Sequence, residues 1–274
     1  MKGIEFKNVS FSYPNGFQAN KNLNLSIKAG ERVAIVGQNG AGKTTAVKMM
    51  NGLYKPTSGD VLIDGVNTKD KTTAQIARSV GYVFQNPDEQ IFNNTVAKEI
   101  EYMPRYFKLP EQEIKSRTEE ALKLTELEDM KNVNPFDISY SIRKFITIAA
   151  VLAARPKYTI WDEPTAGQDY KRRKILKNIL DHLRDKNIGV VVITHDMDFV
   201  VDTFDRVIVM ANKCIIADGT PDEIFWQDNI VKQSCITQPQ IGEIAKALQI
   251  EKPITLRPQM VEFLKNIKGG LKNE

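Results

Sequence analysis

The chain has 274 residues, of which 42% are apolar and 26% are charged, and its formal net charge is +4. These values are ordinary for a globular protein that is long enough to bury a large core, and they exclude a disordered chain. The small basic excess is spread along the chain, whereas a nucleic-acid-binding protein usually concentrates it in one stripe. We therefore expect no nucleic-acid partner.

Cys214 and Cys235 belong to no metal-binding or disulfide motif, which argues against a disulfide framework and a zinc ribbon. No segment approaches the roughly 18 consecutive apolar residues of a membrane span. The first residues also lack the apolar run of a signal peptide. These features predict a protein of the cytoplasm.

Short apolar runs typical of buried strands alternate with helical patterns along most of the chain. The strands are predicted at 3–9, 32–36, 61–63, 80–84, 158–161, 189–194, 207–210 and 214–217. The helices are predicted at 45–52, 110–127, 142–154 and around 175–183. This alternation indicates an α/β fold with a largely parallel sheet covered by helices.

Two regions interrupt the alternation. Residues 96–156 are rich in helical patterns and are predicted to form a helical subdomain of a domain that covers residues 1–226. Residues 227–274 are predicted to form a small helical extension. The apolar positions of this extension that can share one helical face are Ile241, Ile244, Ala247 and Leu248.

A phosphate-binding loop follows the predicted strand 32–36. The run from Gly37 to Thr44 fits the pattern G-x-x-x-x-G-K-[ST], and a helical pattern follows it. Glycines let backbone N–H groups surround phosphates, Lys43 brings a cation to the outer phosphates, and the Thr44 hydroxyl can bind Mg²⁺. The sequence therefore predicts a site for a nucleoside triphosphate and Mg²⁺.

Acidic and imidazole side chains follow two other buried strands. Asp162 ends the strand 158–161 and can hold the Mg²⁺ shell, while Glu163 can orient or deprotonate the attacking water. His195 directly follows the strand 189–194. Because the carboxyl ends of parallel strands meet at one edge of a sheet, we expect these residues beside the phosphate loop. An isolated Asp-Glu pair is more often a solvated helix start, and a lone His is more often structural.

These motifs occur in an order that resembles the nucleotide-binding subunit of an ABC transporter over nearly the whole chain. The ordered set is Tyr13, the phosphate loop, Gln85, a signature region near Ser139, Asp162-Glu163, Asp169 and His195. Within this superfamily, the run Phe84-Gln85-Asn86-Pro87-Asp88-Glu89-Gln90-Ile91-Phe92 is similar to the glutamine loop of cobalt- and vitamin-type energy-coupling factor (ECF) ATPases. The start Phe11-Ser12-Tyr13-Pro14 agrees with that subgroup.

The resemblance implies a P-loop NTPase of ABC type. Its mostly parallel RecA-like core would carry an antiparallel β subdomain, a helical subdomain and a small C-terminal extension that helps to pair two ATPases. The implied nucleotide-binding residues are Tyr13, Gly37, Gln38, Asn39, Gly40, Ala41, Gly42, Lys43, Thr44 and Thr45.

The resemblance also implies roles for single residues. Tyr13 would stack on adenine, although a Tyr near a strand end is more often a packing residue. Gln85 would contact Mg²⁺ or the attacking water, together with Thr44 and Asp162 as metal-site residues. Glu163 would be the general base and His195 would hold the γ-phosphate. Asp169 would bridge to a partner ATPase.

The signature motif departs from the family pattern. The family has Leu-Ser-Gly-Gly-Gln, and the aligned residues are Ile138-Ser139-Tyr140-Ser141-Ile142. Only Ser139 is retained. In the family this loop approaches the γ-phosphate bound by the partner subunit, and side chains in place of the two glycines obstruct such a close backbone approach.

We therefore predict a heterodimer with a second ATPase that has an intact signature. This chain would bind and cleave ATP at its own phosphate loop, and the site formed with its own signature would be weak or silent. The alternative is that the substitutions are tolerated and both sites hydrolyse ATP slowly. Position 168 is Gln, whereas the family usually has leucine there, and this difference is consistent with a changed interface between the two ATPase subunits.

Three functions remain open from the sequence. The first is a motor docked on the cytoplasmic face of a membrane, where it would drive a coupling subunit and a substrate-binding subunit that import a vitamin or a metal ion. The second is a soluble ABC-type ATPase, against which the single cassette argues. The third is a regulatory subunit that binds ATP with little turnover. The transported substrate is not encoded, because such motors do not touch it.

Overall fold

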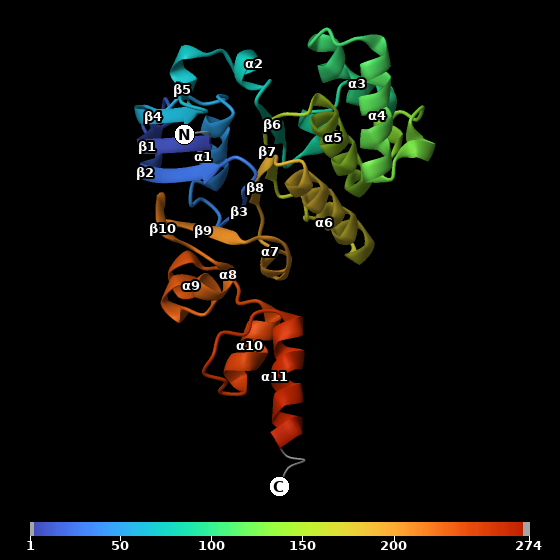
Figure 1. Cartoon of the computed structure of the whole chain (residues 1–274). Coiled ribbons are helices and arrows are strands. Elements are labelled where there is room, and N and C mark those ends of the chain that lie inside the picture. Colours follow the sequence, from blue (N-terminus) through green and yellow to red (C-terminus); the bar gives the residue numbers. More distant parts are fainter. Residues whose placement is uncertain (1–2, 271–274) are drawn as a thin grey trace.

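A six-stranded sheet is the centre of the computed structural model, which describes residues 3–270 (Figure 1). In spatial order its strands are β10 (Cys214–Gly219), β9 (Arg206–Ala211), β3 (Arg32–Val36), β8 (Gly189–Ile193), β7 (Tyr158–Asp162) and β6 (Val80–Val83). All neighbours are parallel except the β9–β10 hairpin. Asn212 and Lys213 both have positive φ in its two-residue turn, as a tight hairpin requires.

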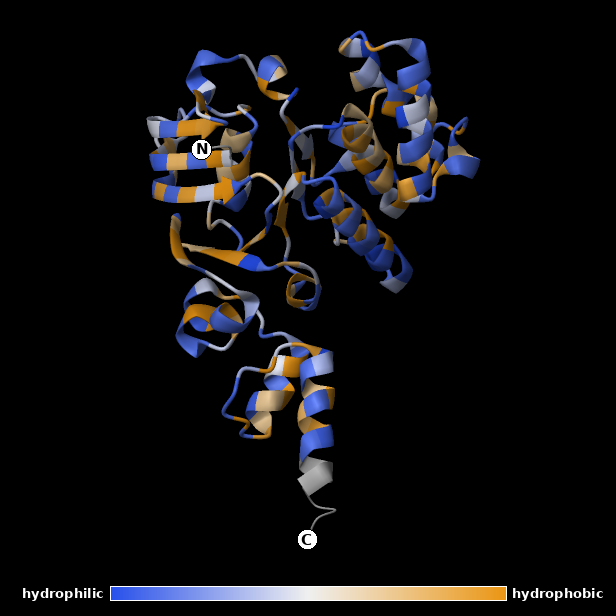
Figure 2. Cartoon of the chain, viewed as in Figure 1, coloured by the Kyte–Doolittle hydropathy of each residue, from blue (hydrophilic) through white to orange (hydrophobic). Residues whose placement is uncertain are grey.

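A second sheet is antiparallel and lies beside the first. Its order is β2 (Gln18–Lys28), β1 (Gly3–Ser12), β4 (Ser58–Ile63) and β5 (Val66–Asn67). Figure 2 shows bands of alternating hydropathy along these strands, because alternate side chains point to opposite faces. This sheet is the antiparallel subdomain that the resemblance implies.

The two faces of the parallel sheet build two separate cores. On β3, Val33 and Ile35 pack in a cluster with α1 (Lys43–Met50) and the antiparallel sheet. Ala34 and Val36 belong to the cluster on the opposite face. That cluster includes α5 (Tyr140–Ala154), α6 (Tyr170–Asp185) and α7 (Met197–Thr203). The phosphate loop therefore starts from a strand residue, Val36, in one core and ends in α1, which packs in the other. Both ends of the loop are fixed in this way.

Three helices form the predicted helical region: α3 (Val96–Tyr106), α4 (Glu111–Thr125) and α5. Pro110 precedes α4, and Glu111 and Glu113 lie in its first turn, where acidic side chains favour the positive end of the helix dipole. The helix ends two residues before the predicted position 127, because Glu126 adopts a left-handed conformation with φ +55°. The short helix α2 (Thr73–Ile76) leads into β6.

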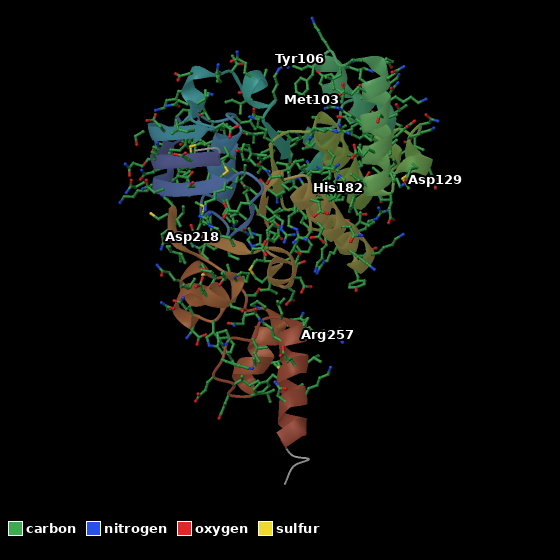
Figure 3. The ribbon with its side chains drawn as sticks, viewed as in Figure 1. Met103, Tyr106, Asp129, His182, Asp218 and Arg257 are labelled. Carbon is green, nitrogen blue, oxygen red and sulfur yellow. The ribbon has the colours of Figure 1, made fainter. Side chains whose placement is uncertain are left out.

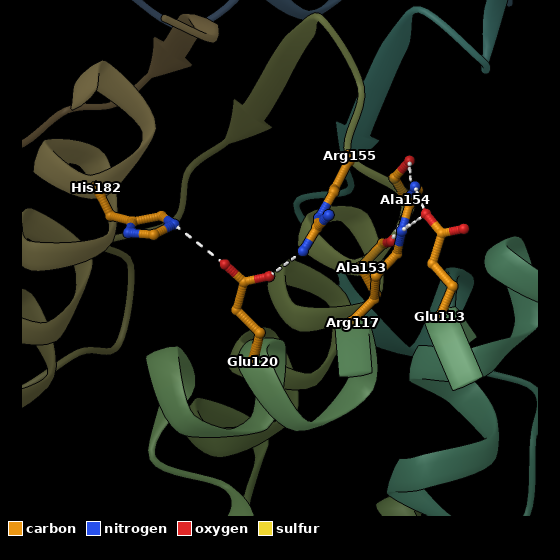
Figure 4. A network of polar contacts seen from close by, with 7 residues as sticks. All are labelled: Glu113, Arg117, Glu120, Ala153, Ala154, Arg155 and His182. Atoms are coloured by element: carbon orange, nitrogen blue, oxygen red, sulfur yellow. Dashed lines mark hydrogen bonds and ion pairs between the residues drawn. The ribbon is translucent and has the colours of Figure 1, made fainter. Parts of the chain in front are cut away.

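Polar side chains join this helical region to the core helix α6 (Figure 4). Glu120 on α4 pairs with Arg155 and lies 3.7 Å from Nε2 of His182 on α6. Arg117 donates hydrogen bonds to Glu113 and, at 3.4 Å, to the carbonyl groups of residues 153 and 154 at the end of α5. The contact between Glu120 and His182 joins α4 to the core helix α6, and the Arg117 contacts hold α4 against the end of α5.

The C-terminal extension is helical as predicted. It consists of α9 (Asp228–Ser234), α10 (Gln240–Ala247) and α11 (Arg257–Gly270), and α8 (Pro221–Phe225) joins it to β10. Figure 1 shows α10 and α11 set apart from the two sheets. Ala245, Ile254 and Met260 form a small core between them. The last residues of the predicted extension, 271–274, lie outside the described residues.

Ile244 on α10 and Leu248, which follows this helix, are 49% and 59% exposed, whereas Ala245 is buried. Part of the predicted contact face therefore points to solvent. Within residues 3–270, no helix combines the length and the apolar character that crossing a bilayer requires.

Candidate nucleotide site

The phosphate loop links β3 to α1 through two glycines whose close neighbours leave no room for a Cβ atom. Gly37 has φ +141° and Gly42 has φ +95°, backbone conformations that other residues rarely adopt. A Cβ atom at Gly37 would lie 2.0 Å from the carbonyl oxygen of Met210, and one at Gly42 would lie 2.4 Å from that of Ala19. The loop is therefore held against β9 and β2, and neither of these two glycine positions has space for a side chain.

Lys43 is buried inside the loop. Its Nζ donates hydrogen bonds to the carbonyl oxygens of Gly37 at 2.6 Å and Gln38 at 3.0 Å. Burial lowers the pKa of Lys43, while the charges of Glu163 and Asp162 raise it. The loop thus holds a cation in place before any phosphate arrives.

A cleft of about 530 Å³ opens beside this loop. It receives side chains from the end of β1, the phosphate loop, the glutamine loop and the ends of β7 and β8. The predicted residues that line it are Tyr13, Asn39, Gly40, Gly42, Lys43, Thr44, Thr45, Gln85, Asp162, Glu163 and His195. The other predicted loop residues, Gly37, Gln38 and Ala41, are not part of the lining of the cleft.

Asp162 is 2% exposed at the end of β7. Its Oδ2 accepts a hydrogen bond of 2.9 Å from the hydroxyl of Tyr82, and its Oδ1 is buried with no hydrogen-bond partner. Burial raises the pKa of Asp162, whereas the hydroxyls of Tyr82 and Thr44 and the nearby lysines lower it. An unpartnered buried carboxylate oxygen beside Thr44 suits a hard cation, which takes oxygen ligands.

Glu163 has a left-handed backbone, with φ +52°. Its N–H donates to the carbonyl of Ile193 on β8 at 2.9 Å. Its Oε2 accepts from the backbone N–H of His195 at 3.3 Å, and its Oε1 lies 3.3 Å from Nε2 of the same residue. Burial is the main cause that raises the pKa of Glu163 to about 7, with the neighbouring Asp162 adding to it. A non-glycine residue in this conformation costs about 1 kcal/mol or more, and such strain is common at functional sites.

His195 completes this edge of the cleft. Its side chain is 45% exposed, and Nε2 lies 3.5 Å from Nζ of Lys43. Burial, followed by the charge of Lys43, lowers the pKa of His195, and Asp162 acts in the opposite direction. The ring therefore lies between the ammonium group of Lys43 and the carboxyl group of Glu163.

Tyr13 belongs to an aromatic cluster at the other end of the cleft. Its ring lies against Phe17 with centroids 6.4 Å and planes 27° apart, and edge-on to Phe11 and Tyr54. Its hydroxyl is 2.9 Å from Oγ1 of Thr45. The ring is thus fixed by packing and also lines the cleft.

The signature residues and Asp169 lie away from this cleft, at the start of two helices. Ser139 is the N-cap residue of α5, but its hydroxyl makes no capping bond and lies 3.4 Å from Oγ of Ser141; Ser139 is exposed, like Tyr140. Asp169 caps α6, where its carboxylate accepts from the N–H of Arg172 at 2.8 Å. Gln168 donates to the carbonyl of Ser141 at 3.0 Å.

Three residues near the site were not singled out from the sequence. Tyr82 bonds Asp162, and Asn20 donates to the carbonyl of Gly42 at 3.1 Å. Lys144 is 2% exposed and donates to the carbonyl of Glu163 at 2.6 Å. Only Lys144 could have been found from the sequence. It is the one charged residue in the otherwise uncharged, mostly apolar run from 144 to 153.

Comparisons with known proteins agree with this geometry. The family model for the ABC transporter matches residues 20–166. A putative ABC transporter ATP-binding protein of Pyrococcus furiosus is 43% identical over 92% of this chain and 95% of its own length. The chain therefore belongs to the ABC transporter family, as an ATP-binding subunit with the ATPase fold of that family.

Two further relatives define the subgroup. The energy-coupling factor transporter ATP-binding protein EcfA of Methanocaldococcus jannaschii is 35% identical over 99% of both chains. The structure of cbiO1 from Clostridium perfringens, part of the ABC transporter complex cbiONQ, is 32% identical with a TM-score of 0.74, covering 90% of this chain and 98% of that one. These findings confirm the predicted ECF or cobalt-type ABC ATPase and its fold class.

A second solved structure is that of an ATP-binding cassette dimer after hydrolysis. The dimer of an ATP-binding cassette in a post-hydrolysis state, bound to ADP and Pi, is 31% identical with a TM-score of 0.73, covering 80% of this chain and 98% of that one. Members of the family hydrolyse ATP, and this chain is an ATPase of that kind.

Proposed function

We propose that this chain is the ATP-hydrolysing motor of an ECF-type importer for a vitamin or a transition-metal ion, at the cytoplasmic face of the cell membrane. It would pair with a second, non-identical ATPase that has an intact signature. The pair would drive an integral membrane coupling subunit and a substrate-binding membrane subunit. One observation carries this proposal: the cleft gathers the phosphate loop, Asp162, Glu163 and His195 in a chain whose signature loop has no glycines.

The phosphate end of ATP would lie on the loop from Gly37 to Thr44. Backbone N–H groups and the buried Lys43 favour negative charge there. The ring of Tyr13 would contact the adenine, which needs only an aromatic face and leaves the hydroxyl bonded to Thr45.

Mg²⁺ fits the oxygen donors at the centre of the cleft. Thr44, Gln85 and Asp162 would hold it, and the free Oδ1 of Asp162 supports this assignment. Bound Mg²⁺ offsets negative charge on the phosphate oxygens.

Glu163 would accept the proton of the attacking water. Its pKa of about 7 matches proton transfer near neutral pH, because a base is most effective when its pKa lies close to the working pH. The two contacts to His195 hold the carboxylate in one orientation, and the imidazole would in turn hold the γ-phosphate.

The second ATP site of the dimer would be weak. Ser139 would be the one signature side chain left for the partner's nucleotide, while the exposed Tyr140 and the half-buried Ser141 occupy the positions of the glycines. Asp169 would contact the partner ATPase from the start of α6. The apolar residues exposed on α10 and α11 offer a further pairing surface.

An apolar groove supports docking on a membrane subunit. A cavity of about 240 Å³ lies between the glutamine loop, α3 and α5, with Phe84, Phe92, Tyr102 and Met103 in its lining. Phe92 is 62% exposed although it is aromatic. Figure 3 shows Met103 and Tyr106 on the side of α3 that faces α2. A short amphipathic helix of a coupling subunit would bury these side chains.

The test is ATPase activity of the purified chain alone and with the second ATPase, together with co-purification of the membrane subunits. We expect low activity alone, a rise of at least about tenfold with the partner, and loss in Glu163→Gln. High activity alone would contradict the heterodimer. ATP binding without turnover in every mixture would instead support the regulatory function, and recovery without membrane subunits would support the soluble one.

A further inference from the structure

The buried Lys144 connects the signature helix of this chain to its own catalytic strand. The side chain leaves the second turn of α5 and its Nζ donates to the main-chain carbonyl of Glu163 at 2.6 Å. The Tyr140 ring lies 5.9 Å from the same Nζ. A cation buried to 98% is costly unless opposite charges and hydrogen bonds surround it.

The Glu163 peptide is held from two sides. Its N–H is bonded to β8 through Ile193, and its carbonyl accepts a short bond from Lys144 and a longer one, of 3.4 Å, from the N–H of Ala166. With φ at +52°, the residue needs such restraints to keep its strained backbone. The direction of the carboxylate depends on this peptide, because the side chain leaves the backbone between these two bonds.

A second hydrogen bond also joins the start of α5 to the segment after β7. Nε2 of Gln168 donates to the carbonyl of Ser141 in the signature loop at 3.0 Å, and Gln168 is buried. Two hydrogen bonds therefore join the first turns of α5 to the segment that follows β7. A shift of the signature loop would move both ends of that segment.

We propose that Lys144 is a positioning residue for ATP hydrolysis: its ammonium group holds the Glu163 carbonyl, aims the Glu163 carboxylate, and ties this chain's own hydrolytic site to the signature loop that it presents to the partner. Lys144 does not line the nucleotide cleft, so it acts through Glu163 and not on ATP. The inference rests on the proposed role of Glu163 as the general base.

The kinetic test uses the complex with the partner ATPase. In Lys144→Met we expect kcat to fall about tenfold, with the KM for ATP and the affinity of the isolated chain for a fluorescent ATP analogue unchanged within about twofold. Lys144→Gln keeps a donor and should recover kcat to within about threefold of the wild type. Lys174→Met, an exposed lysine on α6, is the matched control.

A double variant tests whether Lys144 acts through Glu163. In the Glu163→Gln background, Lys144→Met should not lower the residual rate further. Three results would overturn the inference: an unchanged kcat in Lys144→Met, a joint loss of ATP affinity and melting temperature, or a Gln variant as slow as the Met variant. A merely structural lysine would give the second of these.

A spectroscopic readout needs no turnover. Glu163-Pro164 is the only Glu-Pro pair in the sequence, so labelling with carbonyl-¹³C glutamate and ¹⁵N proline marks this one carbonyl. In Lys144→Met the carbonyl keeps only the longer bond from the N–H of Ala166, so loss of the Lys144 bond should move the ¹³C resonance upfield, and Lys174→Met should leave it in place. An unmoved resonance would overturn the inference even in an active complex. Absence of turnover in the wild-type complex would count against the proposed function alone.

Discussion

The nucleotide cleft and the signature loop belong to one chain but use their backbones in opposite ways. In the cleft, Gly37 and Gly42 bring the backbone so close to its neighbours that a Cβ atom would clash. In the signature loop, Tyr140 and Ser141 place side chains where the family has glycines. The glycines of the first region allow a close approach to phosphate, and we expect the side chains of the second to hinder one. The difference supports the proposal that this subunit keeps its own nucleotide site and depends on a partner for an intact signature.

The two regions also differ in the charges that they bury. Asp162, Glu163, Lys43 and Lys144 are all buried around the hydrolytic site. The signature residues Ser139 and Tyr140 are exposed and uncharged. The buried charges lie in or next to the cleft, and burying them costs free energy, as expected for a catalytic site.

The largest expected effect is on stability. The pKa of Glu163 is raised from its ordinary 4.5 to about 7, so the folded state resists its ionisation. The resulting destabilisation is absent below pH 4.5, grows between pH 4.5 and 7, and is complete above pH 7. Removing the charge with Glu163→Gln should therefore raise the free energy of unfolding by up to about 3 kcal/mol at pH 8 and by little at pH 4.5.

Urea unfolding at these two pH values, without nucleotide, checks this prediction. Asp137→Asn, an exposed carboxyl beside the signature loop, is the control and should show no comparable gain. A gain for Glu163→Gln that is equal at both pH values would contradict the cost of burying this carboxylate.

The second effect concerns the signature loop. Replacing Tyr140, Ser141 and Ile142 by Gly, Gly and Gln should raise the ATPase activity of the chain alone by at least about tenfold, because a homodimer would then have two complete sites. The cost is roughly 1 kcal/mol of helix stability for each glycine at the start of α5. The gain must vanish when Glu163→Gln is added. A triple variant as slow as the wild type would show that the signature does not limit turnover.

The smallest effect concerns the adenine end of the cleft. Tyr13→Ala should weaken ATP binding by about fivefold, since an aromatic contact is worth about 1 kcal/mol. Tyr13→Phe keeps the ring and loses only the bond to Thr45, so its affinity should stay within twofold of the wild type. Titration with a fluorescent ATP analogue distinguishes the two variants. Equal losses in both would indicate that the hydroxyl, and not the ring, supports the site.

Local patterns were sufficient to predict the parallel sheet and the phosphate loop. Runs such as Arg32–Val36 are buried on both faces, so their composition alone indicates a strand, and the loop motif has its own spacing. The strand β2 (Gln18–Lys28) was not predicted from its residues. Its exposed polar face carries Asn22, Asn24 and Lys28, and the pairing with β1 stabilises it.

Contacts between distant segments could not be predicted from the sequence. Lys144 and Glu163 are 19 residues apart, and nothing in the spacing says that a helix side chain meets a strand-end carbonyl. The bond from Tyr82 to Asp162 spans 80 residues for the same reason. The roles of the individual site residues stay predictions, which the variants above address.

The most direct test of the central claim removes one catalytic base at a time from the heterodimer. Steady-state ATP hydrolysis would be compared for the wild-type pair, for Glu163→Gln in this chain, and for the corresponding Glu→Gln change in the partner. We predict that Glu163→Gln lowers turnover at least about 100-fold, whereas the change in the partner lowers it less than about twofold. Equal losses from both changes, or a larger loss from the partner's change, would contradict the account.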